Sequence, residues 1–105
     1  MQGIPALSPQ EEAQAMAELR KRFPNASDAE LQGFLHGRTP PDPGRPEDTK
    51  DPQALQHCLD LVNSTYNDAI KAAESAQPDW LRAMLMAAAL AAAFFGRLEC
   101  YSEND

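Results

Sequence analysis

The feature that most constrains this chain is a run of thirteen residues near its carboxyl end, from Ala83 to Phe95, that contains no polar side chain. The run is rich in alanine, leucine and methionine, which favour helix because their side chains lose little rotamer freedom there. A helix that is apolar around its whole circumference must be enclosed by protein or by lipid. We therefore expect this segment to be the centre of a bundle, an interface with another polypeptide, or a membrane-bound helix.

The chain has few residues with which to cover such a helix. With 105 residues it should form one small domain, which buries only about 60 to 65% of the surface that its unfolded chain exposes. A helix over residues 83–95 is about 20 Å long, and one from Trp80 to Leu98 about 28 Å, against a hydrocarbon core of about 30 Å. A membrane span is therefore marginal, and we expect the helix to have more circumference than the rest of the chain can cover.

Residues that favour strands are scarce, because valine and isoleucine together number three in the whole chain. Helix starts, in contrast, are clearly signalled. Ser8 is followed by Glu11, and Ser27 by Glu30, which is the spacing of a capping box. The sequence therefore predicts two helices in its first third.

The first two helices end at residues that cannot continue them. Pro24 disfavours helix in the residue before it, and Gly37 can adopt the left-handed conformation that closes a helix. From residue 39 to 51 the chain then carries four prolines and no large apolar side chain, which predicts neither helix nor strand. We expect a semi-rigid extended linker there.

A long third helix follows the linker. Asp51 and Pro52 give it a cap and a first-turn proline, and it should run to Ser75. Its apolar residues recur at spacings of three and four, which places them on one face. They are Leu55, Cys58 or Leu59, Val62, Tyr66, Ala69 or Ile70, and Ala73.

A fourth helix is expected from Trp80 to Leu98, with Asp79 as its cap. Together these elements predict an all-α fold, a small bundle of about four helices with a proline-rich linker between the second and the third. The predicted organisation is an N-terminal helical pair at 1–38, the linker at 39–51, and a region at 52–105 that joins the long amphipathic helix to the alanine-rich apolar helix.

Charge excludes one class of partner. Acidic residues outnumber basic ones by 16 to 9, which gives a formal net charge of −7. The one dense cationic run, residues 20–22, lies at a predicted helix end, where cations complement the helix dipole. We expect no nucleic-acid partner, because phosphate binding needs a cationic face.

The cysteines and the first residues bear on location. Cys58 and Cys100 are too few and too far apart in the sequence for a disulfide framework, which favours a reducing compartment. The role of Cys100 stays open between lipidation, crosslinking and none. The first residues lack the basic start and the apolar stretch of a secretory signal. We expect an intracellular location, either cytoplasmic or organellar after loss of a targeting peptide, including a membrane complex.

Candidate catalytic and metal-binding groups are few. His36 and His57 are isolated, and the spacing of His36, His57, Cys58 and Cys100 matches no common zinc site. Adjacent helical residues such as His57 and Cys58 point about 100° apart and do not face one another. The sequence also lacks a glycine-rich phosphate loop. We therefore expect no enzymatic activity, no metal and no cofactor.

One part of the chain has a recognisable family pattern. After the capped first helix, Leu31, Phe34, Leu35 and Arg38 form the pattern Leu-x-x-Phe-Leu-x-x-Arg behind an aspartate-containing cap. Over about residues 7–38 the chain resembles the N-terminal helical region of CRAL-TRIO lipid-transfer proteins. It departs from that family in its proline-rich insertion and in lacking the α/β lipid-binding lobe. The resemblance implies a helical module without the lipid pocket, so no lipid-contacting residue is carried over.

These observations favour a non-catalytic helical accessory or assembly subunit that docks on a larger protein complex, which could be membrane-associated, through its C-terminal apolar helix. The alternative is a lipid- or membrane-binding module related to the N-terminal part of CRAL-TRIO proteins. The expected partner interface consists of the large side chains of the fourth helix. They are Trp80, Leu81, Met84, Leu85, Leu90, Phe94, Phe95 and Leu98.

Overall fold

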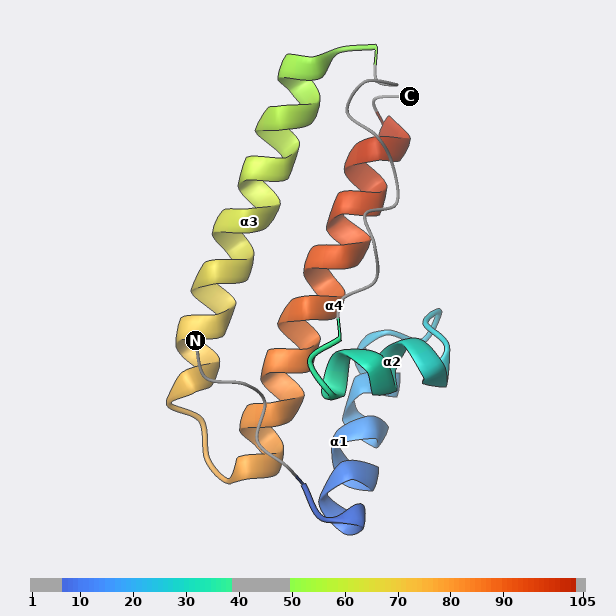
Figure 1. The fold of residues 1–105 in the computed structure, drawn as a ribbon, viewed down its shortest axis with the longest axis vertical. Helices are drawn as coiled ribbons and strands as arrows, with labels where there is room; N and C mark the ends of the chain where they lie inside the picture. Colours follow the sequence, from blue (N-terminus) through green and yellow to red (C-terminus); the bar gives the residue numbers. More distant parts are fainter. Residues whose placement is uncertain (1–6, 39–49, 104–105) are drawn as a thin grey trace.

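The computed structural model describes residues 7–38 and 50–103. Four helices lie in these ranges: α1 (Pro9–Arg22), α2 (Asp28–Leu35), α3 (Pro52–Glu74) and α4 (Asp79–Glu103) (Figure 1). Since no strand occurs in the two described ranges, the predicted all-α bundle is confirmed. Most of the predicted linker, residues 39–49, lies outside the described residues.

The starts of α1 and α2 are the two predicted capping boxes. Ser8 Oγ accepts a hydrogen bond from the Glu11 N–H at 3.2 Å, and Glu11 Oε1 accepts one from the Ser8 N–H at 3.1 Å. Ser27 and Glu30 make the same reciprocal pair at 3.1 and 3.0 Å. Gly37, with φ of 77°, adopts the predicted left-handed conformation after α2. Local signals therefore account for both helices.

The start of α3 also follows its sequence signal. Asp51 Oδ1 accepts from the Ala54 N–H at 3.1 Å, and Pro52 occupies the first helical position, where its missing N–H costs nothing. The helix ends at Glu74, one residue before the predicted end. Its predicted stripe is buried or half-buried, and most other positions of α3 are exposed.

The start of α4 differs from the prediction. The Pro78 carbonyl accepts from the N–H groups of Leu81 and Arg82 at 3.0 and 3.1 Å, so the helix begins at Asp79. Asp79 lies inside the first turn, where its Oδ1 accepts from Arg82 Nη2 at 3.0 Å, and it is not the cap. Its charge still complements the helix dipole there. The helix also continues beyond the predicted end to Glu103.

The helices are arranged around α4. α3 and α4 form a long antiparallel hairpin, while α1 and α2 lie beside the first half of α4 (Figure 1). α4 contacts each of the other three helices, whereas α3 makes extensive contact only with α4 among the described helices. The molecule is elongated as a result, with dimensions of 46 × 26 × 20 Å.

The main hydrophobic core forms where α1 and α2 meet α4. Its α4 side is mostly alanine, which lets the facing helices come close. The fully buried members are Ala15, Met16, Leu19, Leu31, Phe34, Leu35, Ala83, Met84, Ala87 and Ala91. This core joins the N-terminal helical pair to α4, the last helix of the chain.

The rest of the chain covers α4 more fully than we expected. Within residues 83–95 only Ala92 is exposed, and every other position is buried or half-buried. Seven of these thirteen residues are alanine, so the helix is thin and has little surface to cover. The expected excess of uncovered circumference is therefore largely absent.

Candidate protein-binding groove

Most of the large side chains of α4 pack inside the molecule. Met84 is 1% exposed and belongs to the core, so this side chain is not available to a partner in this fold. Five others pack against the core and are half-buried: Leu81, Leu85, Leu90, Phe94 and Phe95. Trp80 is half-buried at the start of α4. Leu98, which is 44% exposed, is therefore the most open of the eight predicted interface residues.

Aromatic contacts explain why the two phenylalanines of α4 face inward. The Phe95 ring stacks on Phe23 with centroids 6.1 Å apart, and the Phe94 ring lies 6.0 Å from that of Phe34. Phe94 and Phe95 also make an edge-to-face contact at 5.4 Å. Such ring pairs add to the burial of apolar area, so these side chains hold α1 and α2 on α4.

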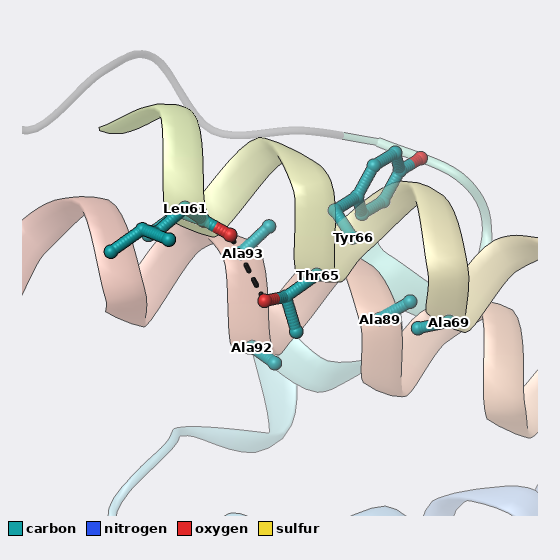
Figure 2. Close-up of a pocket in the computed structure, with 8 residues that line it drawn as sticks. Leu61, Thr65, Tyr66, Ala69, Ala89, Ala92 and Ala93 are labelled. Carbon is teal, nitrogen blue, oxygen red and sulfur yellow. Dashed lines mark hydrogen bonds between the residues drawn. The ribbon is translucent and has the colours of Figure 1, made fainter. Parts of the chain in front are cut away.

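A more accessible apolar surface lies between α3 and α4. It is a groove of about 220 Å³ (Figure 2). We call it the α3–α4 groove; its lining residues are Leu61, Val62, Thr65, Tyr66 and Ala69 of α3 with Ala89, Ala92 and Ala93 of α4. Leu61 is 57% exposed, and Ala92 is exposed on the opposite wall. This groove thus presents apolar side chains that the described helices leave partly uncovered.

Two hydroxyl groups line the groove, and of these the Tyr66 ring points away from the α4 wall (Figure 2). Thr65 Oγ1 donates to the Leu61 carbonyl at 2.9 Å within α3 (Figure 2). That bond occupies the hydroxyl hydrogen and leaves the methyl group of Thr65 to line the groove. The surface consequently recognises shape and apolar area more than hydrogen-bonding groups.

The sequence identified only part of this groove. Val62, Tyr66 and Ala69 belong to the predicted stripe of α3, but Leu61 and Thr65 lie beside it and were not singled out. They are four residues apart and so share a face next to the stripe. With Leu61 and Thr65 included, the apolar face of α3 is wider than one neighbouring helix can cover. That width would have indicated a second contact surface.

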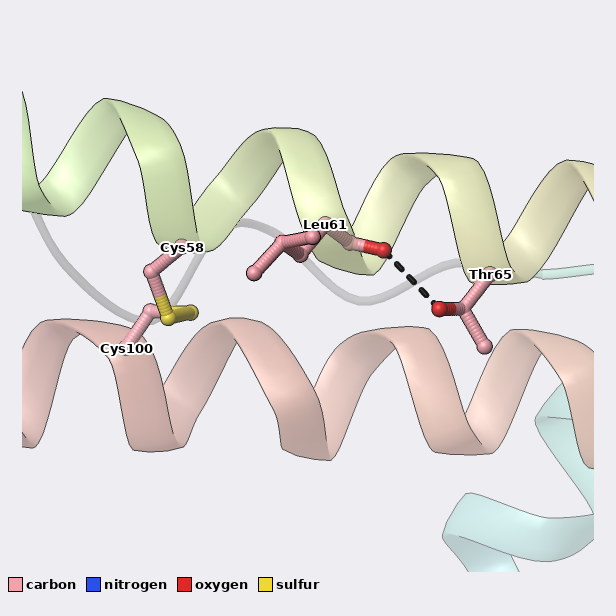
Figure 3. The surroundings of a disulfide bond; sticks show 4 residues. All are labelled: Cys58, Leu61, Thr65 and Cys100. Carbon is pink, nitrogen blue, oxygen red and sulfur yellow. Dashed lines mark hydrogen bonds between the residues drawn. A yellow bond between two sulfur atoms is a disulfide. The ribbon is translucent and has the colours of Figure 1, made fainter.

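A disulfide bond closes the hairpin near one end of the groove. Cys58 of α3 and Cys100 of α4 are bonded, with their Cα atoms 5.8 Å apart (Figure 3). The sequence left the role of Cys100 open between lipidation, crosslinking and none, and the structure shows crosslinking. The reducing compartment inferred from the few, widely separated cysteines stays a prediction. In an antiparallel hairpin, residues equally distant from the turn lie side by side, and these two are nearly equidistant from Pro78. That symmetry was the missed signal.

The disulfide constrains a large loop. Its cysteines are separated by 42 positions, and closing a loop of that size removes about 4 kcal/mol of chain entropy from the unfolded state in the usual polymer treatment. Gly96, one turn before Cys100, allows close approach as well, because a Cβ there would lie 3.1 Å from Val62 Cγ2. The end of α4 is therefore held on α3 by one covalent bond and one tight backbone contact.

A second hollow, of about 320 Å³, lies at the turn between α1 and α2. It is lined by Arg22, Phe23, Pro24, Asn25, Ala26 and Phe95. Its apolar floor is the Phe23–Phe95 ring pair, which already belongs to the packing of α1 on α4. We therefore regard the α3–α4 groove as the better candidate site.

The histidines that the sequence raised as catalytic candidates line neither hollow. His36 Nε2 is 2.6 Å from Glu12 Oε1, and this pair joins the end of α2 to the start of α1. The His36 side chain is 51% exposed and lines neither hollow. Among the described residues no three histidine, cysteine or acidic side chains cluster as metal ligands would. The absence of enzymatic activity stays a prediction.

One ion pair connects α1 to α2 across their turn. Arg20 Nε and Nη2 donate to the two carboxylate oxygens of Asp28 at 2.9 and 3.3 Å. These hydrogen bonds, with the attraction between the charges, lower the pKa of Asp28 below its usual value and raise that of Arg20. Both side chains are more than half exposed, so the pair is screened by water and salt.

By length and composition α4 is also long and apolar enough to cross a membrane. Its most apolar window has a mean hydropathy of 1.5, and 39% of that window is buried inside the molecule. Comparison with known proteins adds no further assignment: no protein-family model, curated protein or solved structure matches the chain. The relationship to CRAL-TRIO proteins accordingly stays a prediction.

Proposed function

We propose that this protein is a non-catalytic helical accessory subunit that docks on a partner protein through the α3–α4 groove. The observation that carries the proposal is an apolar groove with Leu61 57% exposed on its wall. Most of the eight α4 residues predicted as the partner interface pack inside the molecule. The proposed contact is therefore on the side of α4 that faces α3.

The shape of the groove suits an α-helix as its occupant. Two antiparallel helices form its walls, and the α4 wall is alanine (Ala89, Ala92 and Ala93), whose small side chains allow close approach. A third helix laid there would complete a three-helix layer, in the way that helical ligands fill grooves between helices. Its apolar face would cover Leu61 and Ala92.

Charge complementarity indicates the polar face of that helix. Residues 51–103 carry seven acidic and three basic side chains. Asp68, one turn after Thr65, and Glu99, two turns after Ala92 on the same face of α4, are both exposed, whereas Arg97, one turn after Ala93, is half-buried. We therefore propose an amphipathic partner helix whose polar face is basic.

The test uses the oxidised 105-residue protein and a synthetic helix of about 20 leucine, alanine and lysine residues with an apolar stripe. We expect amide chemical shifts to change around Leu61, Thr65 and Ala92 on titration. Ala92→Lys should weaken binding about tenfold or more, because it places a like charge in the groove. Ala17→Lys, on an exposed position of α1, is the matched control and should bind as the wild type does.

Two results would contradict the proposal. One is the absence of any shift change at these residues under conditions where the peptide is helical. The other is binding that Ala17→Lys and Ala92→Lys reduce equally, since that pattern reports nonspecific attraction between a basic peptide and a chain of net charge −7.

The second candidate is membrane or lipid binding, which is favoured by the length and hydropathy of α4. It requires α1, α2 and α3 to release α4, because much of its apolar window is covered by them. Co-flotation with neutral phosphatidylcholine vesicles at low and high salt tests it. Protein that stays entirely with the soluble fraction at both salt concentrations would rule this candidate out.

A further inference from the structure

We infer that the Cys58–Cys100 disulfide is a redox latch that controls the α3–α4 groove, so that the oxidised protein docks its partner and reduction releases it. The inference rests on the proposed function and names the regulation of the same site. It starts from the position of the bond: Leu61 follows Cys58 by one turn on α3, and Thr65 follows Leu61 by one more (Figure 3). The disulfide therefore fixes the end of the wall that carries the exposed leucine.

The first half of α3 depends on this bond because, among the described residues, its packing is limited and Leu55 is its one fully buried side chain. Among the described helices α3 packs extensively only against α4, and its only fully buried residues are Leu55 and Ala73. Near Val62 the α4 side of that contact is Ala93 and Gly96, which bury little apolar area. A helix that packs against a single neighbour opens more readily than one that packs against two.

The other half of α4 is held independently of the disulfide. α1 and α2 pack on it through the core and through the Phe23–Phe95 and Phe34–Phe94 ring pairs. Reduction should therefore free residues of α3 around Leu55 to Val62 while α1, α2 and the first half of α4 stay folded. Because Leu61 and Val62 are groove residues, their release removes one wall of the site.

The chemistry is a two-step exchange with a dithiol reductant. Cys100 is 1% exposed whereas Cys58 is half-buried, so the first thiolate attacks Cys58 Sγ. A mixed disulfide forms on Cys58, the bond to Cys100 breaks, and Cys100 leaves as a thiolate that takes up a proton. The second thiol of the reductant then displaces Cys58, which is protonated in turn. The reductant gives two electrons and two protons and becomes a disulfide.

The experiment compares the oxidised protein, the protein reduced with dithiothreitol, and the variant C58A/C100A, using the leucine–alanine–lysine helix as the probe. We expect reduction to weaken peptide binding about tenfold or more, and amide exchange at Leu55 to Val62 to accelerate about 30-fold or more. Exchange at Leu19 and Leu31 should accelerate clearly less than exchange at Leu55 to Val62. The variant should behave like the reduced protein and should not respond to dithiothreitol.

The outcomes separate this inference from the proposed function. An oxidised protein that fails to bind the peptide overturns the proposed function, and the inference with it. Equal binding by the oxidised and reduced proteins leaves the docking site standing and overturns only the latch. Acceleration of exchange at Leu19 and Leu31 to the same extent as at Leu55 also overturns the latch, because the bond then stabilises the whole fold rather than one wall.

Discussion

The two halves of α4 are held in different ways. Residues 83–95, the core half, lie against α1 and α2 through large apolar side chains and phenylalanine pairs. Residues 96–103, the disulfide half, lie beside the start of α3 through Gly96 and the bond of Cys100 to Cys58. Packing holds the first half and covalent closure the second, which means that the two can be weakened separately.

The largest effect is expected from removing a ring of the core half. Phe34 is 0% exposed, so Phe34→Ala should lower the free energy of unfolding by about 3 to 5 kcal/mol through lost transfer energy and a cavity. Urea titration without reductant, which keeps the disulfide intact, measures this loss of free energy. Phe34→Leu is the matched control and should cost clearly less. Equal losses for the two variants would mean that the ring is not packed as described.

Removal of the disulfide should have the second-largest effect on the free energy of unfolding. C58A/C100A should lower the free energy of unfolding by about 2 to 4 kcal/mol, because the unfolded chain regains the entropy of an open loop. The same urea titration measures it, without reductant. If the variant were as stable as the wild type, packing would hold both halves of α4 and the contrast between them would fail.

A smaller effect is expected at the close contact of the disulfide half. Gly96→Leu should destabilise the protein by about 1 to 3 kcal/mol, since even a Cβ there would lie 3.1 Å from Val62 Cγ2. Gly33→Ala, in α2 with nothing within 4 Å of an added Cβ, should instead stabilise by about 0.5 to 1 kcal/mol. Thermal unfolding followed by circular dichroism compares them. A neutral Gly96→Leu would show that α3 can move away without cost.

The smallest effect concerns pH at the α1–α2 turn. The pKa of Asp28 is lowered in the folded state by Arg20, so the stabilisation by this pair is present above the ordinary aspartate pKa of about 3.9 and is lost as pH falls through the lower folded value. Asp28→Asn should remove this part of the pH dependence, and salt should reduce it in the wild type. A difference in stability between the two proteins that stays constant from about pH 6 to below about pH 4 would contradict the ion pair.

The sequence predicts the helices well because their starts depend on neighbouring residues. Ser8 with Glu11 and Ser27 with Glu30 satisfy backbone groups three residues away, so the signal is local. The start of α4 is less predictable, because Pro78 precedes the helix and its carbonyl accepts the first helical hydrogen bonds, while the Asp79 carboxylate accepts from the Arg82 side chain instead of capping. Which aspartate or proline position precedes the helix is decided by the geometry of the turn.

The contacts between helices were harder to predict, because they depend on register. Whether Phe94 faces a partner or Phe34 is not decided by its spacing in α4, since an apolar helix has no polar face to orient it. The pairing of Cys58 with Cys100 follows only once α3 and α4 are known to be antiparallel with their turn near Pro78. The groove depends on both facts, which is why only its α3 stripe was visible beforehand.

The cross-link also divides the polypeptide topologically. Residues between Cys58 and Cys100 form a closed ring that includes most of α3, the turn and most of α4, whereas α1 and α2 lie on the open arm that precedes it. A protease that cuts the turn between α3 and α4 would leave both pieces on one covalent molecule, and the nick would appear on a gel only after thiol treatment. A cut before Cys58 would separate the arm on a denaturing gel without thiol treatment.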